Sequence, residues 1–211
     1  MDNSHLYENK LYKNKEKKNA FPPGRIKIVN ALITLLESNN FGSITTNEIA
    51  KTAGVTEALI YKYFKDKRDL LHEVLKEYLE HYVLFMKEKT KNIKDWKKRL
   101  HTLFKLHFQL YSINRVLPKI LILEVRNYPH FYKSAPYKVV KEYARYVQNI
   151  IEEGVSCNEI RDDILPKTIR QFVLGAFEHF VLPRIIYNLE IDEQLLADDL
   201  CELIFNGITK N

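Results

Sequence analysis

The stretch TTNEIAKTAGVTEALIYKYFKDKRDLL, residues 45–71, carries the clearest structural pattern in this chain. Ala50, Gly54 and Ile60 stand within it at spacings of four and six residues. At these spacings a small residue lets two helices approach, a glycine accepts the left-handed turn between them, and an aliphatic residue closes their core. The stretch therefore predicts a helix-turn-helix.

Two threonines mark where the two short helices begin. Thr45 is followed three residues later by Glu48, the capping-box spacing that satisfies free N–H groups at a helix start. Thr56 stands where it would cap the second helix. A short, supported helix of this kind can enter the major groove of DNA with its N-terminal residues towards the bases.

Over residues 25–72 the sequence resembles the tetracycline-repressor (TetR) family of bacterial regulators. The resemblance rests on the first helix and on four short motifs: Ile49-Ala50, Ala53-Gly54-Val55-Thr56, Tyr61-x-Tyr63-Phe64 and the following Lys67. It implies a DNA-binding regulator, with a helix-turn-helix in the first third of the chain and a helical dimerisation and effector domain after it.

The resemblance also implies which residues touch double-stranded DNA. It gives phosphate contacts to Thr45, Thr46, Thr56, Tyr61 and Lys67, and it places near the base edges Thr46, Glu57, Ala58, Leu59 and Lys62. Glu57 and Leu59 depart from the residue types that the family more often has at these places. Glu57 can accept a hydrogen bond from a cytosine amino group or simply complement the helix dipole.

Charge is divided unevenly along the chain. The net charge is +6, with 33 Lys and Arg against 27 Asp and Glu. Residues 1–105 hold 21 of those basic residues and 13 of the acidic ones, so this half has a charge of +8 and the remaining half −2. Such a division suits a module that faces phosphates joined to one that does not, although solvated lysines alone give the same count.

The pattern along the whole chain predicts an all-α fold of about nine helices. Residues 1–24 are expected to form a flexible basic arm, 25–70 the helix-turn-helix domain and 71–211 a larger helical domain for effector binding and dimerisation. Apolar periodicity predicts a single helix over 115–127 and another over 166–188. Pro183 falls inside the second of these and is expected to kink or divide it.

In the larger domain, aromatic residues at helical spacing suggest an apolar pocket for a small apolar or aromatic effector, for example a fatty-acyl or multidrug-type compound. The predicted pocket wall is Phe104, His107, Phe108, Tyr111, Tyr146, Phe172 and Phe177. The alternative is that these side chains simply pack a solid core. The resemblance implies a homodimer through the last two helices, for which the candidates are Gly175, Ala176, Leu196, Leu200 and Leu203.

Other classes of protein are less consistent with the sequence. No apolar run approaches a bilayer span, and the N-terminus lacks a secretory signal, so a cytoplasmic protein with no membrane partner is expected. Cys157 and Cys201 stand far apart without metal-ligand spacing, so no metal or cofactor is expected. Catalytic motifs are missing, which argues against an enzyme.

We therefore expect a ligand-responsive repressor that binds a near-palindromic operator as a homodimer, with repression resting on the family resemblance. The remaining alternative is a helix-turn-helix protein that organises DNA or recruits a partner without a small-molecule ligand. A cavity within one subunit would favour the sensor, and a solid core would favour the organiser.

Overall fold

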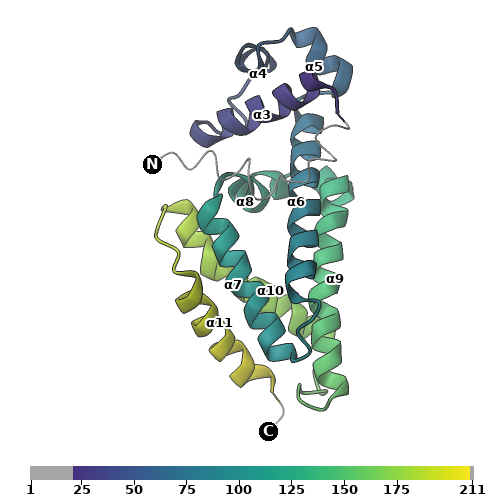
Figure 1. Cartoon of the computed structure of the whole chain (residues 1–211), viewed down its shortest axis with the longest axis vertical. Helices are drawn as coiled ribbons and strands as arrows, with labels where there is room; N and C mark the ends of the chain where they lie inside the picture. Colours follow the sequence, from purple (N-terminus) through teal and green to yellow (C-terminus); the bar gives the residue numbers. More distant parts are fainter. Residues whose placement is uncertain (1–20, 210–211) are drawn as a thin grey trace. The chain divides into compact units, whose positions relative to one another are not determined.

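Helices make up most of the computed structural model, which describes residues 21–209 (Figure 1). Over this range it has nine α-helices and no β-strand, so the predicted all-α class is confirmed. The predicted arm, 1–24, falls almost wholly outside the described residues. The helices are α3 (Pro23–Ser38), α4 (Thr46–Ala53), α5 (Glu57–Tyr63), α6 (Lys67–Thr90), α7 (Trp96–Ile113), α8 (Val116–Lys119), α9 (Ala135–Ser156), α10 (Pro166–Ile186) and α11 (Glu193–Ile208).

Several helices begin at residues whose chemistry favours a helix start. Pro23 and Pro166 occupy the first turns of α3 and α10, where a missing N–H costs little. Asp95 accepts a 2.7 Å hydrogen bond from the Lys98 N–H at the start of α7. Asp192 accepts from two N–H groups in the first turn of α11.

The prediction of one continuous helix over 115–127 is wrong. α8 is followed there by a π-helical turn, η1 (Ile120–Glu124), and by two 3₁₀ turns, η2 (Val125–Asn127) and η3 (Pro129–Lys133). Asn114 accepts from the N–H groups of Val116 and Leu117 and so caps the start of α8, and Pro118 lies in the first turn of that helix, where a missing N–H costs little. Pro183 does not divide α10, which ends one turn later at Ile186.

The chain forms two compact units. Over the described residues, the first unit contains 21–82 and 120–137, and the second contains 83–119 and 138–209. The predicted domain boundary after residue 70 stays a prediction. α6 begins in the first unit and ends in the second.

In the first unit, α3, α4 and α5 lie together around fully buried aliphatic side chains, among them Ile28, Leu32, Ile49 and Ile60 (Figure 1). The segment 120–137 packs on the start of α6. There Arg68 lies 3.5 Å over the ring of Tyr128, and the rings of His72 and Phe131 are 6.1 Å apart. Burial lowers the pKa of His72.

In the second unit, α7 packs along α11, and the two helices run side by side in Figure 1. Trp96 at the start of α7 meets Phe205 of α11 edge to face, with ring centroids 5.4 Å apart. The Trp96 indole also donates a 2.7 Å hydrogen bond to Glu159. Over the described residues, no helix combines the length and apolar character that a bilayer crossing requires.

Candidate nucleic-acid interface and effector pocket

α4 begins with the capping box that the sequence predicts. The Thr45 N–H donates to Glu48 Oε2 at 2.7 Å, and the Glu48 N–H donates back to Thr45 Oγ1 at 3.2 Å. Hydrogen bonds from the Thr45 side chain and backbone lower the pKa of Glu48. The helix ends at Gly54, whose φ of 63° lies in the left-handed region that favours glycine. Both ends of α4 are therefore fixed by residues next to it in sequence.

Glu57 ties α5 to α4. Its two carboxylate oxygens accept hydrogen bonds from Thr46 Oγ1 at 3.0 Å and from Asn47 Nδ2 at 2.9 Å, and these bonds lower the pKa of Glu57. The Tyr61 hydroxyl also donates to Thr46 Oγ1, at 3.5 Å. This bridge between the two helices is a role that the sequence did not suggest for Glu57.

Four residues form the exposed face of α5, which we call the α5 surface: Thr56, Ala58, Tyr61 and Lys62. Tyr61 is 54% exposed. Thr56 occupies the N-cap position as expected, but its side chain makes no capping hydrogen bond. Leu59 lies against α3, because a Cβ added at Gly24 would come within 2.8 Å of Leu59 Cδ2.

Lys67 differs from the other candidates for DNA contact. Its ammonium donates to the carbonyl oxygens of Phe41, at 2.8 Å, of Gly42, at 3.4 Å, and of Ile44. Burial is the main cause of the lowered pKa of Lys67. Thr45, Thr46 and the α5 surface are thus close together, whereas Lys67 is engaged by the loop before α4.

Five of the predicted pocket residues meet in the second unit around Phe177. The rings of Phe104, His107, Phe108 and Tyr111 lie with centroids 5.7, 4.6, 5.0 and 5.9 Å from that of Phe177. All five side chains are buried. Of the other two predicted wall residues, Tyr146 shares a 2.7 Å hydrogen bond with Thr90, and Phe172 is 55% exposed.

A buried polar pair adjoins these rings. His107 Nε2 and the Tyr143 hydroxyl share a hydrogen bond of 2.5 Å. Burial lowers the pKa of His107 to about 3 and raises that of Tyr143 well above its usual value. Both side chains are therefore neutral near pH 7.

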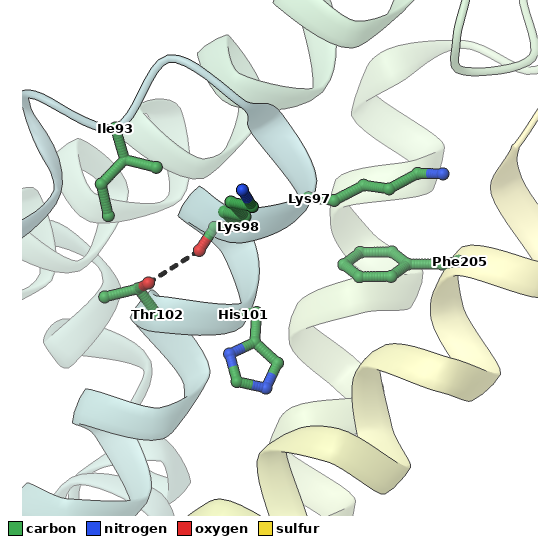
Figure 2. A pocket seen from close by; sticks show the side chains of 6 residues that line it. All are labelled: Ile93, Lys97, Lys98, His101, Thr102 and Phe205. Carbon is green, nitrogen blue, oxygen red and sulfur yellow. Dashed lines mark hydrogen bonds between the residues drawn. The ribbon is translucent and has the colours of Figure 1, made fainter.

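A surface pocket of about 450 Å³, largely open to solvent, lies elsewhere in the same unit, between the start of α7 and α11 (Figure 2). Its lining is Ile93, Lys97, Lys98, His101, Thr102 and Phe205. Thr102 donates a 2.7 Å hydrogen bond to the Lys98 carbonyl, and His101 Nε2 lies 2.6 Å from Asp198 Oδ1. Two ammonium groups beside apolar side chains suit a ligand that is partly anionic and partly apolar.

The sequence pattern did not indicate a site at the lysines of this pocket. Lys97 and His101 stand one helical turn apart, which places them on one side of α7. Phe205, however, comes from the last helix, and no local pattern brings it to α7. This pocket was therefore outside the reach of local spacing.

The predicted dimer residues fall into two groups. Leu196 and Leu200 are buried within the chain, at 4% and 1% exposed, on the side of α11 that packs on α7. Leu203 is 64% exposed, Ala176 is half-buried, and a Cβ added at Gly175 would meet nothing within 4 Å. Leu195, next to Leu196 in sequence, is 56% exposed. It therefore joins Leu203 as an exposed apolar side chain of α11.

Two family models match adjoining parts of the chain. Residues 28–74 match "Bacterial regulatory proteins, tetR family", and residues 75–207 match "YsiA-like protein, C-terminal region", which belongs to the same group of models. The first match contains α4 and α5, and the second contains α7 to α10.

Individual proteins extend this comparison. A fatty acid metabolism regulator protein of Bacillus subtilis is 26% identical over 186 residues, which is 88% of this chain and 96% of that protein. The crystal structure of the transcriptional regulator FadR from Bacillus subtilis with stearoyl-CoA has a TM-score of 0.79 at 26% identity, over 87% of this chain and 98% of that one.

A third relative matches over a shorter stretch. The nucleoid occlusion factor SlmA of Marinobacter nauticus is 45% identical over 65 residues, 31% of this chain and 33% of that protein. Since the YsiA-like match alone spans more than half of the chain and directly follows the tetR match, this chain belongs to the tetR family of bacterial regulatory proteins.

Proposed function

We propose that this regulator represses transcription as a homodimer on a near-palindromic operator and leaves that operator when a fatty-acyl effector binds. Its family consists of regulatory proteins rather than enzymes, in agreement with the expectation from the sequence. The main support for DNA binding is the exposure of the α5 surface. It lies beside the first turn of α4, which Glu57 binds through Thr46 and Asn47.

Within that surface the residues divide by chemistry. Lys62 and Ala58 are the candidates for base contact, because an ammonium recognises guanine acceptors and a methyl group packs on the thymine methyl. The Thr56 hydroxyl is suited to a phosphate oxygen, and those of Tyr61, Thr45 and Thr46 can donate to phosphates by exchanging their present hydrogen bonds to Thr46, Glu48 and Glu57. Leu59 and Glu57 contribute by holding α5 against its neighbours.

A homodimer supplies a second recognition helix, the α5 of the partner subunit. One short helix covers only a few base pairs, so two-fold symmetry is needed to repeat it about one helical turn, roughly 34–36 Å, away on DNA. The exposed apolar groups of α10 and α11 support such a dimer, namely Leu195, Leu203 and Phe172 with the open backbone at Gly175. These residues replace Leu196 and Leu200 as our first candidates for the interface.

The test begins by binding the pure protein to fragments of its own genome and footprinting the bound site. Lys62→Ala should change which base pairs are preferred, whereas the exposed Lys138→Ala of α9 should leave the preference unchanged. A monomer in sedimentation that still binds DNA tightly would contradict the dimer. Unchanged sequence preference in Lys62→Ala would contradict its base contact.

The effector part of the proposal rests on the relatives and on the pocket in Figure 2. A FadR structure with stearoyl-CoA resembles this chain over 87% of its length. The pocket offers Lys97 and Lys98 for anionic oxygens, and Ile93 and Phe205 for an apolar group. A long-chain acyl-CoA, which joins phosphates to an alkyl chain, has both kinds of group.

To test this, operator release is measured with stearoyl-CoA, free coenzyme A and stearate. Binding of stearoyl-CoA should lower the affinity for the operator about five- to 150-fold, which corresponds to typical allosteric coupling energies. By linkage, operator DNA must weaken stearoyl-CoA binding by the same factor. The Lys97→Ala, Lys98→Ala double variant should bind stearoyl-CoA more weakly, and Lys94→Ala, outside the pocket lining, serves as the matched control. No release by any of the three compounds would reject the acyl-CoA effector.

The DNA-organising alternative has one observation in its favour, the 45% identity to a nucleoid occlusion factor. That similarity is confined to 31% of the chain, whereas the similarity to the fatty acid metabolism regulator spans 88%. The comparison over the greater length favours the ligand-responsive regulator.

A further inference from the structure

The hydrogen bonds of Lys67 raise a question about how it serves DNA binding. A lysine ammonium has three N–H donors and no acceptor. Here three carbonyl oxygens, those of Phe41, Gly42 and Ile44, lie within hydrogen-bond distance of Nζ. One acceptor for each donor leaves none for a phosphate oxygen while this arrangement persists.

The surroundings of Lys67 hold the ammonium in place. Nζ lies 4.5 Å from the centroid of the Phe41 ring, an additional cation–π contact, and Phe41 itself is buried. Ile44, which supplies another of the carbonyls, is also buried. The loop thus contacts the partly exposed ammonium with one ring face and three carbonyl oxygens.

The bonded loop leads directly into the DNA-binding helices. Ile44 is followed by Thr45, the N-cap of α4, and then by Thr46, which donates to Glu57 of α5. Lys67 is the first residue of α6. Its side chain therefore connects the start of α6 to the loop that sets the position of the first turn of α4.

We infer that Lys67 is a positioning residue for DNA binding: it fixes the loop over residues 41–44 and so orients α4 and the α5 surface, without itself neutralising a phosphate. This inference rests on the proposed function and replaces, for this residue, the phosphate contact that the family resemblance implies. The two roles, positioning residue and phosphate contact, predict different dependence of DNA affinity on salt concentration. A lost phosphate contact lowers the salt slope of binding by about one, whereas a misplaced surface weakens binding at every salt concentration.

The experiment compares two neutral variants, Lys67→Met and Lys67→Gln, with the wild type over a range of salt concentrations. Methionine removes the charge and all three donors, whereas glutamine removes the charge but keeps two donors. We expect Lys67→Met to lower operator affinity about tenfold, because hydrogen bonds from a charged group are lost, and Lys67→Gln to lower it less. In both variants the slope of log operator affinity against log salt concentration should change by well under one.

A second measurement does not involve DNA. Amide hydrogen exchange over residues 41–49 of the free protein should be faster in Lys67→Met than in the wild type, with exchange in α7 and α11 unchanged. If wild-type protein failed to bind any genomic fragment, the proposed function would fail while this measurement still tested Lys67. A slope lowered by about one in both variants, with equal loss of affinity and unchanged exchange over 41–49, would overturn the inference.

Discussion

α4 and α5 in the first unit are joined by short polar contacts, whereas α7 in the second unit is joined to its neighbours mainly by aromatic rings. Glu57 accepts from two side chains of α4, and neither helix is longer than the eight residues of α4. α7 instead places Phe104, His107 and Phe108 around Phe177 of α10. The first arrangement depends on a few orientations of polar groups, and the second on buried volume.

This difference has energetic consequences. Exposed or half-exposed hydrogen bonds contribute about 0.5–1.5 kcal/mol each, whereas a buried aromatic side chain contributes several times as much. Substitutions in the two regions should therefore differ both in size and in what they disturb. The following three predictions test that contrast, beginning with the largest effect.

Phe177→Ala should lower the free energy of unfolding by about 3–5 kcal/mol, because it removes the ring that four other rings contact and leaves a cavity. Urea unfolding followed by circular dichroism measures the change. Leu84→Ala, at a side chain that is 52% exposed, is the control and should cost about 0.5 kcal/mol or less. Equal losses in the two variants would remove the contrast.

The buried His107 should make the second unit sensitive to acid. Its pKa in the folded protein is about 3, below the ordinary value of 6.5, so between these pH values the unfolded chain binds a proton that the folded chain does not. Its contribution to stability is complete above pH 6.5 and is lost as the pH falls, by about 1.4 kcal/mol for each pH unit. His107→Gln should remove this part of the pH dependence of unfolding.

The matching control for His107 is His101→Gln, which changes a histidine of the pocket lining in the same helix. Unfolding free energies at pH 7 and pH 5 are compared for the three proteins. If the pH dependence of His107→Gln equalled that of the wild type, the buried neutral state of His107 would be disproved.

Gly54→Ala should cost about 1–2 kcal/mol, since alanine at a φ of 63° is strained even though its Cβ would meet nothing within 4 Å. Gly42→Ala, which also has open space but no positive φ, should leave the unfolding free energy nearly unchanged. Gly54→Asn should recover part of the loss, because asparagine tolerates the left-handed region. A loss in Gly42→Ala as large as in Gly54→Ala would show that backbone conformation is not the cause.

The local part of the fold could be predicted from the sequence. The capping box at Thr45 and the left-handed turn at Gly54 depend on residues a few positions apart, and the structure confirms both. The prediction failed over 115–127, where short π and 3₁₀ turns form after α8. These helix types differ in residues per turn, but one or two turns of each are too short for the spacing of apolar residues to tell them apart.

The candidate sites show the same limit. The clustering of four predicted rings around Phe177 follows the predicted wall, yet Phe172 on the same helix is exposed, because five residues along an α-helix place two side chains about 140° apart. The bridge made by Glu57 and the carbonyl bonds of Lys67 join residues more than ten positions apart. Such contacts depend on how helices pack, which the spacing of residue types does not specify.

Over the described residues, the first unit is assembled from two separate stretches of the chain, 21–82 and 120–137. A protease that cut only in the turn between α6 and α7, which belongs to the second unit, would break the covalent connection between these two stretches without removing the segment that packs on α6. The Tyr128 and Phe131 rings would stay beside Arg68 and His72 through packing alone. An N-terminal fragment ending at residue 82, in contrast, would expose those faces of α6 to water, so the start of α6 depends for part of its packing on the later segment 120–137.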